Sequence, residues 1–379
     1  MRTLQVVAGF LILFAVLLDA FEAIILPRRV TRRFRLTRLF YRSTWQPWRA
    51  IGLTMKSPKT RESFFSYYGP LSLLVLLSVW AVGLIVGFAL LILAAGPPTI
   101  PYPTRFDFLT TLYISGTNFF TLGLDEVVPR TMLGRILTVA EAGMGFGFLA
   151  IVIGYLPVIY QAFSRREVAV VLLDARAGSP PTAAELLRRH AHAQGAEAMR
   201  QLLFEWERSS AELLESHVSY PVVTYFRSQH DNQSWLGALT AILDTCALTI
   251  VSTDTSCTKQ AQLTFAMTRH TVADLAQVFK VPPRPPNPDR LPASELLRLR
   301  ETLTSAGLRI RSGPAEDKKL AELRAMYEPY VFALADFLAI NLPPWIHTKA
   351  VADNWRTTAW GRISGADGHE LASPSDDHS

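Results

Sequence analysis

The segment 121–126, with the sequence TLGLDE, places a threonine, a glycine and two adjacent carboxylates between two long apolar runs. Irregular backbone is tolerated at membrane depth only where it lines a cavity. The carbonyl oxygens of such a segment can replace the hydration shell of a cation. We therefore interpret residues 106–126 as a re-entrant pore loop, in which a short helix enters the membrane and an extended segment leaves it.

Three apolar runs are long enough to position such a loop. They cover residues 4–26, 69–95 and 134–163, and about 20 apolar residues are enough to span a bilayer as a helix. The fold class predicted is an all-α membrane protein with three transmembrane helices and a re-entrant pore helix with its filter, followed by a helical cytoplasmic domain.

Basic residues predict the orientation of these spans. Eleven Lys or Arg lie between residues 27 and 62, whereas only Arg105 and Arg130 lie between residues 96 and 133. The positive-inside rule then places 27–62 and 164–379 in the cytoplasm, with the N-terminus outside. We expect a multi-pass protein of the cell (inner) membrane. The arginines indicate topology and contact with anionic lipids rather than nucleic-acid binding.

The sequence divides into six predicted segments. Capping-box residues Thr182 and Glu185 begin a helix after the last span, apolar side chains recur at helical spacing over much of the remainder, and Trp45 and Trp48 suggest an interfacial segment. The segments are a first span with a basic linker (1–62), the pore module (63–163), a cytoplasmic helical domain (164–281), a Pro-rich linker (282–292), a C-terminal helical segment (293–362) and a disordered tail (363–379). Helices are predicted at 195–216, 234–251, 258–279, 293–306 and 315–341.

Glycines are concentrated in the third apolar run. They allow either close packing against the pore helix or bending of the inner helix as a gating hinge, and proline removes a helical hydrogen bond. Both interpretations stay open. The candidate hinge residues are Gly143, Gly145, Gly147, Gly154 and Pro157.

The order of outer helix, pore helix, filter and inner helix resembles the pore module of prokaryotic tetrameric potassium channels, over residues 69–163. The filter of that family usually reads Thr-Val-Gly-Tyr-Gly-Asp, and here Asp125 stands in place of the second glycine. Aspartate tolerates positive φ better than bulkier residues. The resemblance implies an ion-conducting filter formed by Thr121, Leu122, Gly123, Leu124 and Asp125.

The resemblance also implies an acidic outer mouth and a brace behind the filter. Asp125 and Glu126 would ring the mouth with carboxylates, which attract cations. Glu126 matches the family aspartate that contacts an aromatic residue of the pore helix, and Tyr113 occupies one such aromatic position.

One pore loop per chain cannot enclose a pore, so the interpretation is a homotetrameric cation channel. It would conduct potassium, with sodium as the alternative ion, and a cytoplasmic ligand or protein would bias its gating. No nucleophile motif organises its Ser, His and Asp residues, so an enzyme is not predicted; neither is a cofactor, nor a metal beyond the permeating cation. A nonselective pore and a non-conducting membrane sensor or scaffold are the alternatives.

Two further groups of polar residues have simpler interpretations. Asp19 and Glu22 lie three residues apart in the first span, and we expect them to pair with an inner-leaflet arginine such as Arg28. His217 is expected to be a core or surface histidine, although its titration range leaves a pH-sensing role open.

Overall fold

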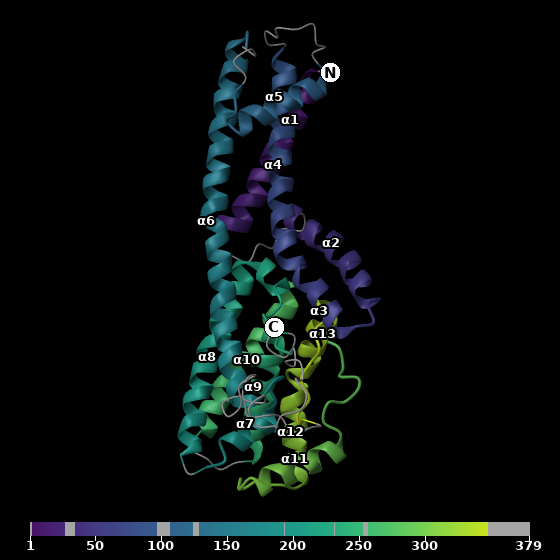
Figure 1. Ribbon diagram of the computed structural model, residues 1–379, viewed down its shortest axis with the longest axis vertical. Coiled ribbons are helices and arrows are strands. Elements are labelled where there is room, and N and C mark those ends of the chain that lie inside the picture. Colours follow the sequence, from purple (N-terminus) through teal and green to yellow (C-terminus); the bar gives the residue numbers. More distant parts are fainter. Residues whose placement is uncertain are drawn as a thin grey trace, which may run out of the picture. The chain divides into compact units, whose positions relative to one another are not determined.

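The computed structural model describes residues 2–26, 35–96, 107–123, 129–192, 194–230, 232–252 and 257–347 (Figure 1). Within these ranges the chain consists of helices and loops, without a β-strand. It divides into two compact units. The membrane unit comprises residues 1–50 and 67–161, and the C-terminal unit comprises residues 51–66 and 162–379.

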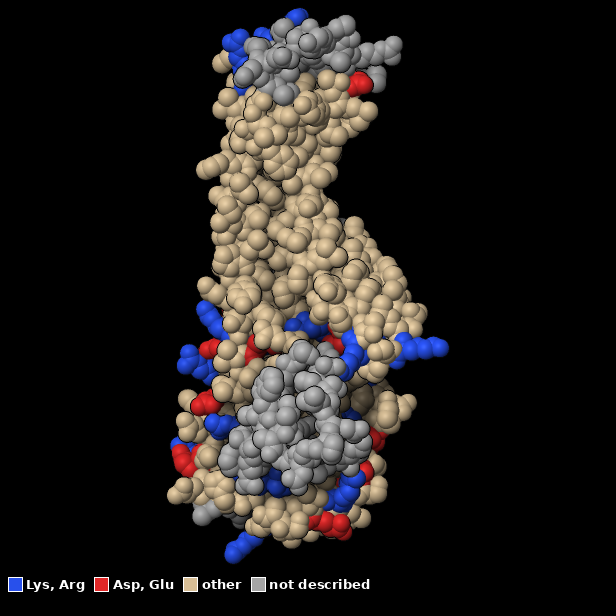
Figure 2. All heavy atoms as spheres, viewed as in Figure 1, with Lys and Arg blue, Asp and Glu red and all other residues tan. Residues whose placement is uncertain are grey.

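Three helices are long and apolar enough to cross a membrane, which confirms the three predicted spans. Helix α1 (Arg2–Ala20) ends in a π-helical turn (Phe21–Ile25), and α4 (Tyr68–Ala95) and α6 (Met132–Ala177) are the other two. The face of the membrane unit in Figure 2 is largely free of charged side chains along these helices, whereas charged residues are scattered over the C-terminal unit.

Glycines let α1 and α4 approach closely. A Cβ atom added at Gly9 would lie 2.9 Å from the carbonyl oxygen of Gly87, and one added at Gly87 would lie 2.7 Å from the side chain of Leu13. Small residues at a helix interface are a usual solution in membranes, because association there relies on close van der Waals packing. Helix α1 therefore covers one face of α4 within the same chain.

Asp19 joins three helices at the end of α1. Its carboxylate is fully buried. It accepts hydrogen bonds from the backbone N–H and hydroxyl of Thr37 in α2 (Leu36–Leu53) at 3.0 and 2.6 Å, and from the indole of Trp80 in α4 at 3.1 Å. Glu22 pairs with Arg35 at 3.4 Å, as expected, whereas the partners of Asp19 among the described residues are a threonine and a tryptophan instead of the expected arginine. Arg28 lies outside the described residues.

The tryptophans of helix α2 pack on α4, and the interfacial position of this helix stays a prediction. Trp45 is 2% exposed, because its ring packs on Tyr68 of α4 with 4.8 Å between centroids. Trp48 packs on the same tyrosine at 5.6 Å. Aromatic packing on α4 occupies these rings. The short helix α3 (Pro58–Ser66) follows α2.

Helix α6 is longer than the apolar run that predicted it. The run ends at Phe163, but the helix continues to Ala177 and passes through Pro157. Its 46 residues correspond to about 69 Å at 1.5 Å per residue, more than twice the hydrocarbon thickness. After Phe163 the helix becomes amphipathic and buries Val170 and Leu173 in the C-terminal unit.

The C-terminal unit is built from helices at the predicted positions. Its two longest, α8 and α10, pack side by side. The element predicted at 315–341 is two helices instead of one, because Pro329 near the start of α13 lacks the N–H that would continue α12. The elements are α7 (Ala183–Arg189), α8 (Gly195–Ser219), a 3₁₀ turn (Pro221–Tyr225), α9 (Trp235–Ser252), α10 (Thr258–Val278), α11 (Ala293–Ser305), α12 (Pro314–Ala325) and α13 (Glu328–Leu338).

A buried ionic cluster attaches the Pro-rich segment to this unit. The guanidinium of Arg290 donates to Asp244 of α9 at 2.6 Å and to the carbonyl of Pro343 at 2.8 Å. The hydroxyl of Tyr327 donates to the same aspartate at 2.5 Å. Burial, followed by the charge of Asp244, raises the pKa of Tyr327 well above its usual value. The segment 282–292 is therefore fixed to the core at its end.

His217 is a core histidine. It is fully buried; its Nδ1 donates to the carbonyl of Leu213 at 2.8 Å, and its ring packs on Trp235. Burial, together with the nearby charge of Arg166, lowers its pKa to about 3. The imidazole is therefore neutral near physiological pH, which argues against His217 as a pH sensor in that range.

Candidate ion-conduction site

Helix α5 (Phe108–Phe119) precedes the candidate filter, and both of its ends are specified by local hydrogen bonds. Asp107 caps the start, because its carboxylate accepts from the backbone N–H of Thr110 at 2.9 Å. At the other end the N–H of Thr121 donates to the carbonyl of Asn118 at 3.0 Å, and that of Leu122 donates to Thr117 at 2.9 Å. This pair of bonds is the Schellman arrangement that ends many helices.

The Schellman arrangement places Thr121 in an unusual conformation. Its φ is +56°, in the left-handed region, which is a genuine outlier for a β-branched residue and costs about 1–3 kcal/mol. Glycine usually occupies this position. Gly123 follows with φ +66°, and Leu122 between them is 73% exposed in the single chain. The three candidate filter residues of this strained turn are exposed in the single chain. Leu124, Asp125 and Glu126 lie outside the described residues.

One face of α6 holds α5 in place. The carboxyl group of Glu141 is hydrogen-bonded to the hydroxyl of Ser115 and accepts from the amide of Asn118 at 3.4 Å. Gly145, four residues later, is so close to α5 that an added Cβ would lie 1.8 Å from the carbonyl oxygen of Phe119. The ring of Phe148 packs on that of Phe119 with 5.9 Å between centroids. Positions 141, 145 and 148 share one helix face.

Three further glycines in the middle of α6 face elsewhere. Gly143, Gly147 and Gly154 are separated by four and seven residues, so they lie on one face, and nothing in the described chain lies within 4 Å of a Cβ added at any of them. Pro157 is exposed. The glycine-rich pattern thus has two parts. Gly145 packs against α5, whereas the other three form an open face that could contact another subunit or line a pore.

Sequence reasoning selected Tyr113 as the brace and missed Glu141, Ser115 and Asn118. Tyr113 lies in α5 and is 63% exposed, and its expected partner Glu126 lies outside the described residues, so that brace stays a prediction. Glu141 and Ser115 are both fully buried. A carboxyl group within a membrane span is costly and usually functional, and its spacing from Gly145 and Phe148 was the signal that could have identified it.

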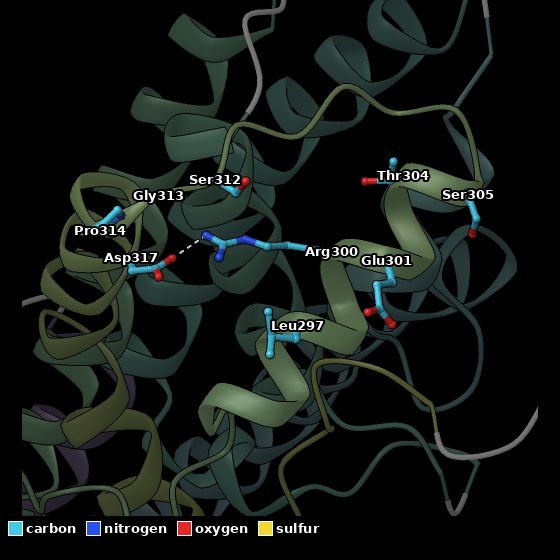
Figure 3. Close-up of a pocket in the computed structure, with 9 residues that line it drawn as sticks. All are labelled: Leu297, Arg300, Glu301, Thr304, Ser305, Ser312, Gly313, Pro314 and Asp317. Carbon is cyan, nitrogen blue, oxygen red and sulfur yellow. Dashed lines mark hydrogen bonds and ion pairs between the residues drawn. The ribbon is translucent and has the colours of Figure 1, made fainter.

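An open hollow of about 720 Å³ lies between α11 and α12 in the described part of the C-terminal unit. Arg300 and Asp317 form an ion pair across it (Figure 3). A charged ligand would therefore compete with a pair that is already formed. Among the described residues, no group of three His, Cys, Asp or Glu side chains is arranged to hold a metal ion.

A comparison with known families agrees with this geometry. A family model described as "Ion channel" matches residues 74–161, the range that contains α5, the strained turn and the buried face of α6. Comparisons with curated proteins and with solved structures find no match. The matched range runs from within α4 to the first part of α6 and resembles an ion-channel domain, and the chain carries it on apolar helices long enough to cross a membrane.

Proposed function

We propose that four copies of this chain assemble into a cation channel that conducts potassium. The observation that carries the proposal is the strained turn 121–123, whose residues are exposed in the single chain. A carbonyl-lined filter needs this arrangement, because the ion is coordinated on an axis that several chains share. A single re-entrant loop does not enclose such an axis.

The apolar surface of α6 supports the assembly of several chains. Only 11% of its most apolar stretch is buried, compared with 56% in α4, which α1 and α5 cover. Its exposed face also carries Gly143, Gly147 and Gly154, and small residues permit close approach between membrane helices. In the proposed tetramer, the neighbouring copies and the pore axis adjoin this surface, and α1 faces lipid.

The ion-binding part of the proposal rests on the segment 121–126. Thr121, Leu122, Gly123 and Leu124 contribute carbonyl oxygens, and Asp125 and Glu126 form a carboxylate ring at the outer mouth that concentrates cations. Bending of α6 near Gly154 and Pro157 opens and closes the inner side. The channel lies in the cell (inner) membrane, and its C-terminal helices lie in the cytoplasm. There a ligand or protein biases the equilibrium between the open and the closed channel.

Two measurements on the full-length protein test the proposal. In detergent, native mass measurement is expected to give the mass of four subunits. In liposomes, a bi-ionic reversal potential is expected to favour potassium over sodium. A stable monomer, or liposomes that pass neither ion, contradicts the channel and leaves a sensor or scaffold. Equal passage of both ions supports the nonselective alternative.

Asp125 allows a sharper test of the filter. Asp125→Asn keeps a residue that tolerates positive φ but removes the charge, so selectivity should persist while conductance at low salt falls. The loss should shrink as salt increases, because the Debye length drops from ~30 Å at 0.01 M to ~10 Å at 0.1 M. Asp125→Gly, the matched control, should maintain or raise selectivity. Unchanged low-salt conductance in Asp125→Asn would contradict the carboxylate ring.

A further inference from the structure

The carboxyl group of Glu141 forms one end of a hydrogen-bond chain across three helices. Its Oε1 is bonded to the hydroxyl of Ser115 in α5, and that hydroxyl lies 2.7 Å from the carbonyl oxygen of Ile85 in α4. Its Oε2 accepts from the amide of Asn118. Glu141 and Ser115 are fully buried. These hydrogen bonds connect α6, α5 and α4 within one chain, and Ser115 lies less than two turns of helix before Thr121.

Counting protons along this chain indicates the charge of Glu141. A serine hydroxyl has one proton to donate and can also accept, whereas the carbonyl of Ile85 can only accept. If Glu141 were ionised, Ser115 would face two acceptors and could donate fully to one of them. If Glu141 is a neutral acid, it donates to Ser115, Ser115 donates to Ile85, and both contacts are satisfied. Buried polar groups are strongly favoured when every partner is satisfied.

Among the described residues of α4, α5 and α6, no charged side chain is placed to stabilise an ionised carboxylate at Glu141. Helices α4 and α5, which supply its partners, contain no Asp, Glu, Lys, Arg or His, and the titratable group on α5 is the exposed Tyr113. The nearest charged residue on α6 is Arg135, six positions earlier, whose Nε donates to the carbonyl of Pro129 at 3.3 Å. An isolated buried charge is far more costly than a buried neutral acid.

We propose that Glu141 is a neutral carboxylic acid that positions α5, by donating its proton to Ser115 while accepting from Asn118. The role rests on the proposed channel function, because α5 ends in the strained turn that presents Thr121. The hydroxyl of Ser115 then donates to the carbonyl of Ile85. This pair of hydrogen bonds, the relay, connects α6 and α4 to α5. Loss of the relay leaves the turn free to shift, and the filter carbonyls with it.

Three substitutions in the full-length protein distinguish a neutral acid at position 141 from a carboxylate and from a side chain that only fills space. Glu141→Gln keeps the length, an NH₂ group that can donate to Ser115 and a carbonyl that can accept from Asn118, so it preserves every bond of the neutral acid. Glu141→Ala removes all of them. Ser115→Ala breaks the relay and leaves the acid in place. Hydrogen exchange of the α5 amides should match wild type in Glu141→Gln and accelerate about tenfold or more in the other two, as expected for losing a buried hydrogen bond.

Infrared spectroscopy tests the proton directly. At neutral pH the exposed carboxyl groups are ionised, so the wild-type spectrum minus that of Glu141→Gln should show the C=O stretch of a protonated acid. A carboxylate band in that difference overturns the proposal. Exchange in Glu141→Gln as fast as in Glu141→Ala overturns it as well.

Flux through liposomes completes the test and distinguishes it from a failure of the proposed function. If wild type conducts, potassium selectivity should persist in Glu141→Gln and fall about tenfold in Glu141→Ala. Equal selectivity in all variants overturns the positioning role. If wild type passes no ion, the channel proposal fails, while the infrared and exchange results still decide whether Glu141 is neutral and holds α5.

Discussion

Gly145→Ala is expected to damage the channel although it adds a single methyl group. The new Cβ would lie 1.8 Å from the carbonyl oxygen of Phe119, and an ordinary contact begins at 3.4 Å, so the two helices must separate by up to 1.6 Å (3.4 minus 1.8). The obstacle is backbone, which cannot rotate away as a side chain could. Forced overpacking costs about 1–3 kcal/mol, equivalent to a roughly 5- to 150-fold change in an equilibrium.

The displaced group is the carbonyl two residues before Thr121, so the effect should appear in ion selectivity as well as in stability. The assay is the bi-ionic reversal potential of the purified protein in liposomes, with thermal unfolding in detergent measured alongside. We expect Gly145→Ala to lower both potassium selectivity and the unfolding temperature. Selectivity should fall because Phe119, the last residue of α5, directly precedes the turn that contains Thr121.

Gly143→Ala and Gly147→Ala are the matched controls on the same helix. Nothing in the described chain lies within 4 Å of a Cβ added at either position, and alanine favours a helix by ~1 kcal/mol over glycine. Both variants should leave the packing of α6 against α5 undisturbed, so a loss that they cause reports contact with a neighbouring copy and not with α5. Wild-type selectivity and stability in Gly145→Ala would refute the reasoning. So would a loss in both controls that leaves Gly145→Ala unaffected, because the close approach would then lie on the opposite face of α6.

Two further predictions concern the C-terminal unit. The pKa of His217 is lowered to about 3 from an ordinary value of 6.5. As pH falls, the unfolded state therefore binds a proton at this histidine before the folded state does. The free energy of unfolding should fall between these two pKa values, by up to ~1.4 kcal/mol per pH unit. Urea denaturation followed by the fluorescence of the adjacent Trp235 should show a weaker pH dependence in His217→Gln, and an identical dependence would contradict it. Arg290→Met leaves Asp244 buried without its cation and should cost about 3–5 kcal/mol, whereas Arg284→Ala, which removes an exposed ion pair, should cost at most ~1 kcal/mol in the same urea assay. Equal losses would contradict the distinction.

The helices were predictable because their signals are local. An apolar run longer than a bilayer predicted each span, and the capping residue Thr182 marked the start of α7, where its hydroxyl accepts from the N–H of Glu185 at 3.3 Å. The end of α6 was not predictable in this way. Beyond Phe163 the helix changes from lipid-compatible to amphipathic composition without a helix-breaking residue, so hydropathy changes where the backbone does not.

The candidate site was predictable in position but not in its supporting contacts. The sequence TLGLDE marked the turn, yet nothing local shows that Ser115 and Glu141 meet across 26 residues. The glycine pattern was visible, but residues two apart lie on nearly opposite sides of a helix. Which of Gly143 and Gly145 faces α5 depends on the rotation of α6 about its axis, and tertiary packing sets that rotation.

Asp19 in the first helix gains its hydrogen-bond donors only as later parts of the chain are synthesised. Its hydrogen-bond donors are Thr37, 18 residues later, and Trp80, 61 residues later. At a synthesis rate of ~5–20 residues per second, the ribosome needs about 3–12 s to advance from the aspartate to the tryptophan. During that interval the first helix carries a carboxylate that the chain has not yet supplied with its indole donor. The hydrogen bonds to Asp19 are therefore complete only after α4 has been synthesised. A nascent chain arrested before Trp80 would present to the insertion machinery an acid without its indole donor.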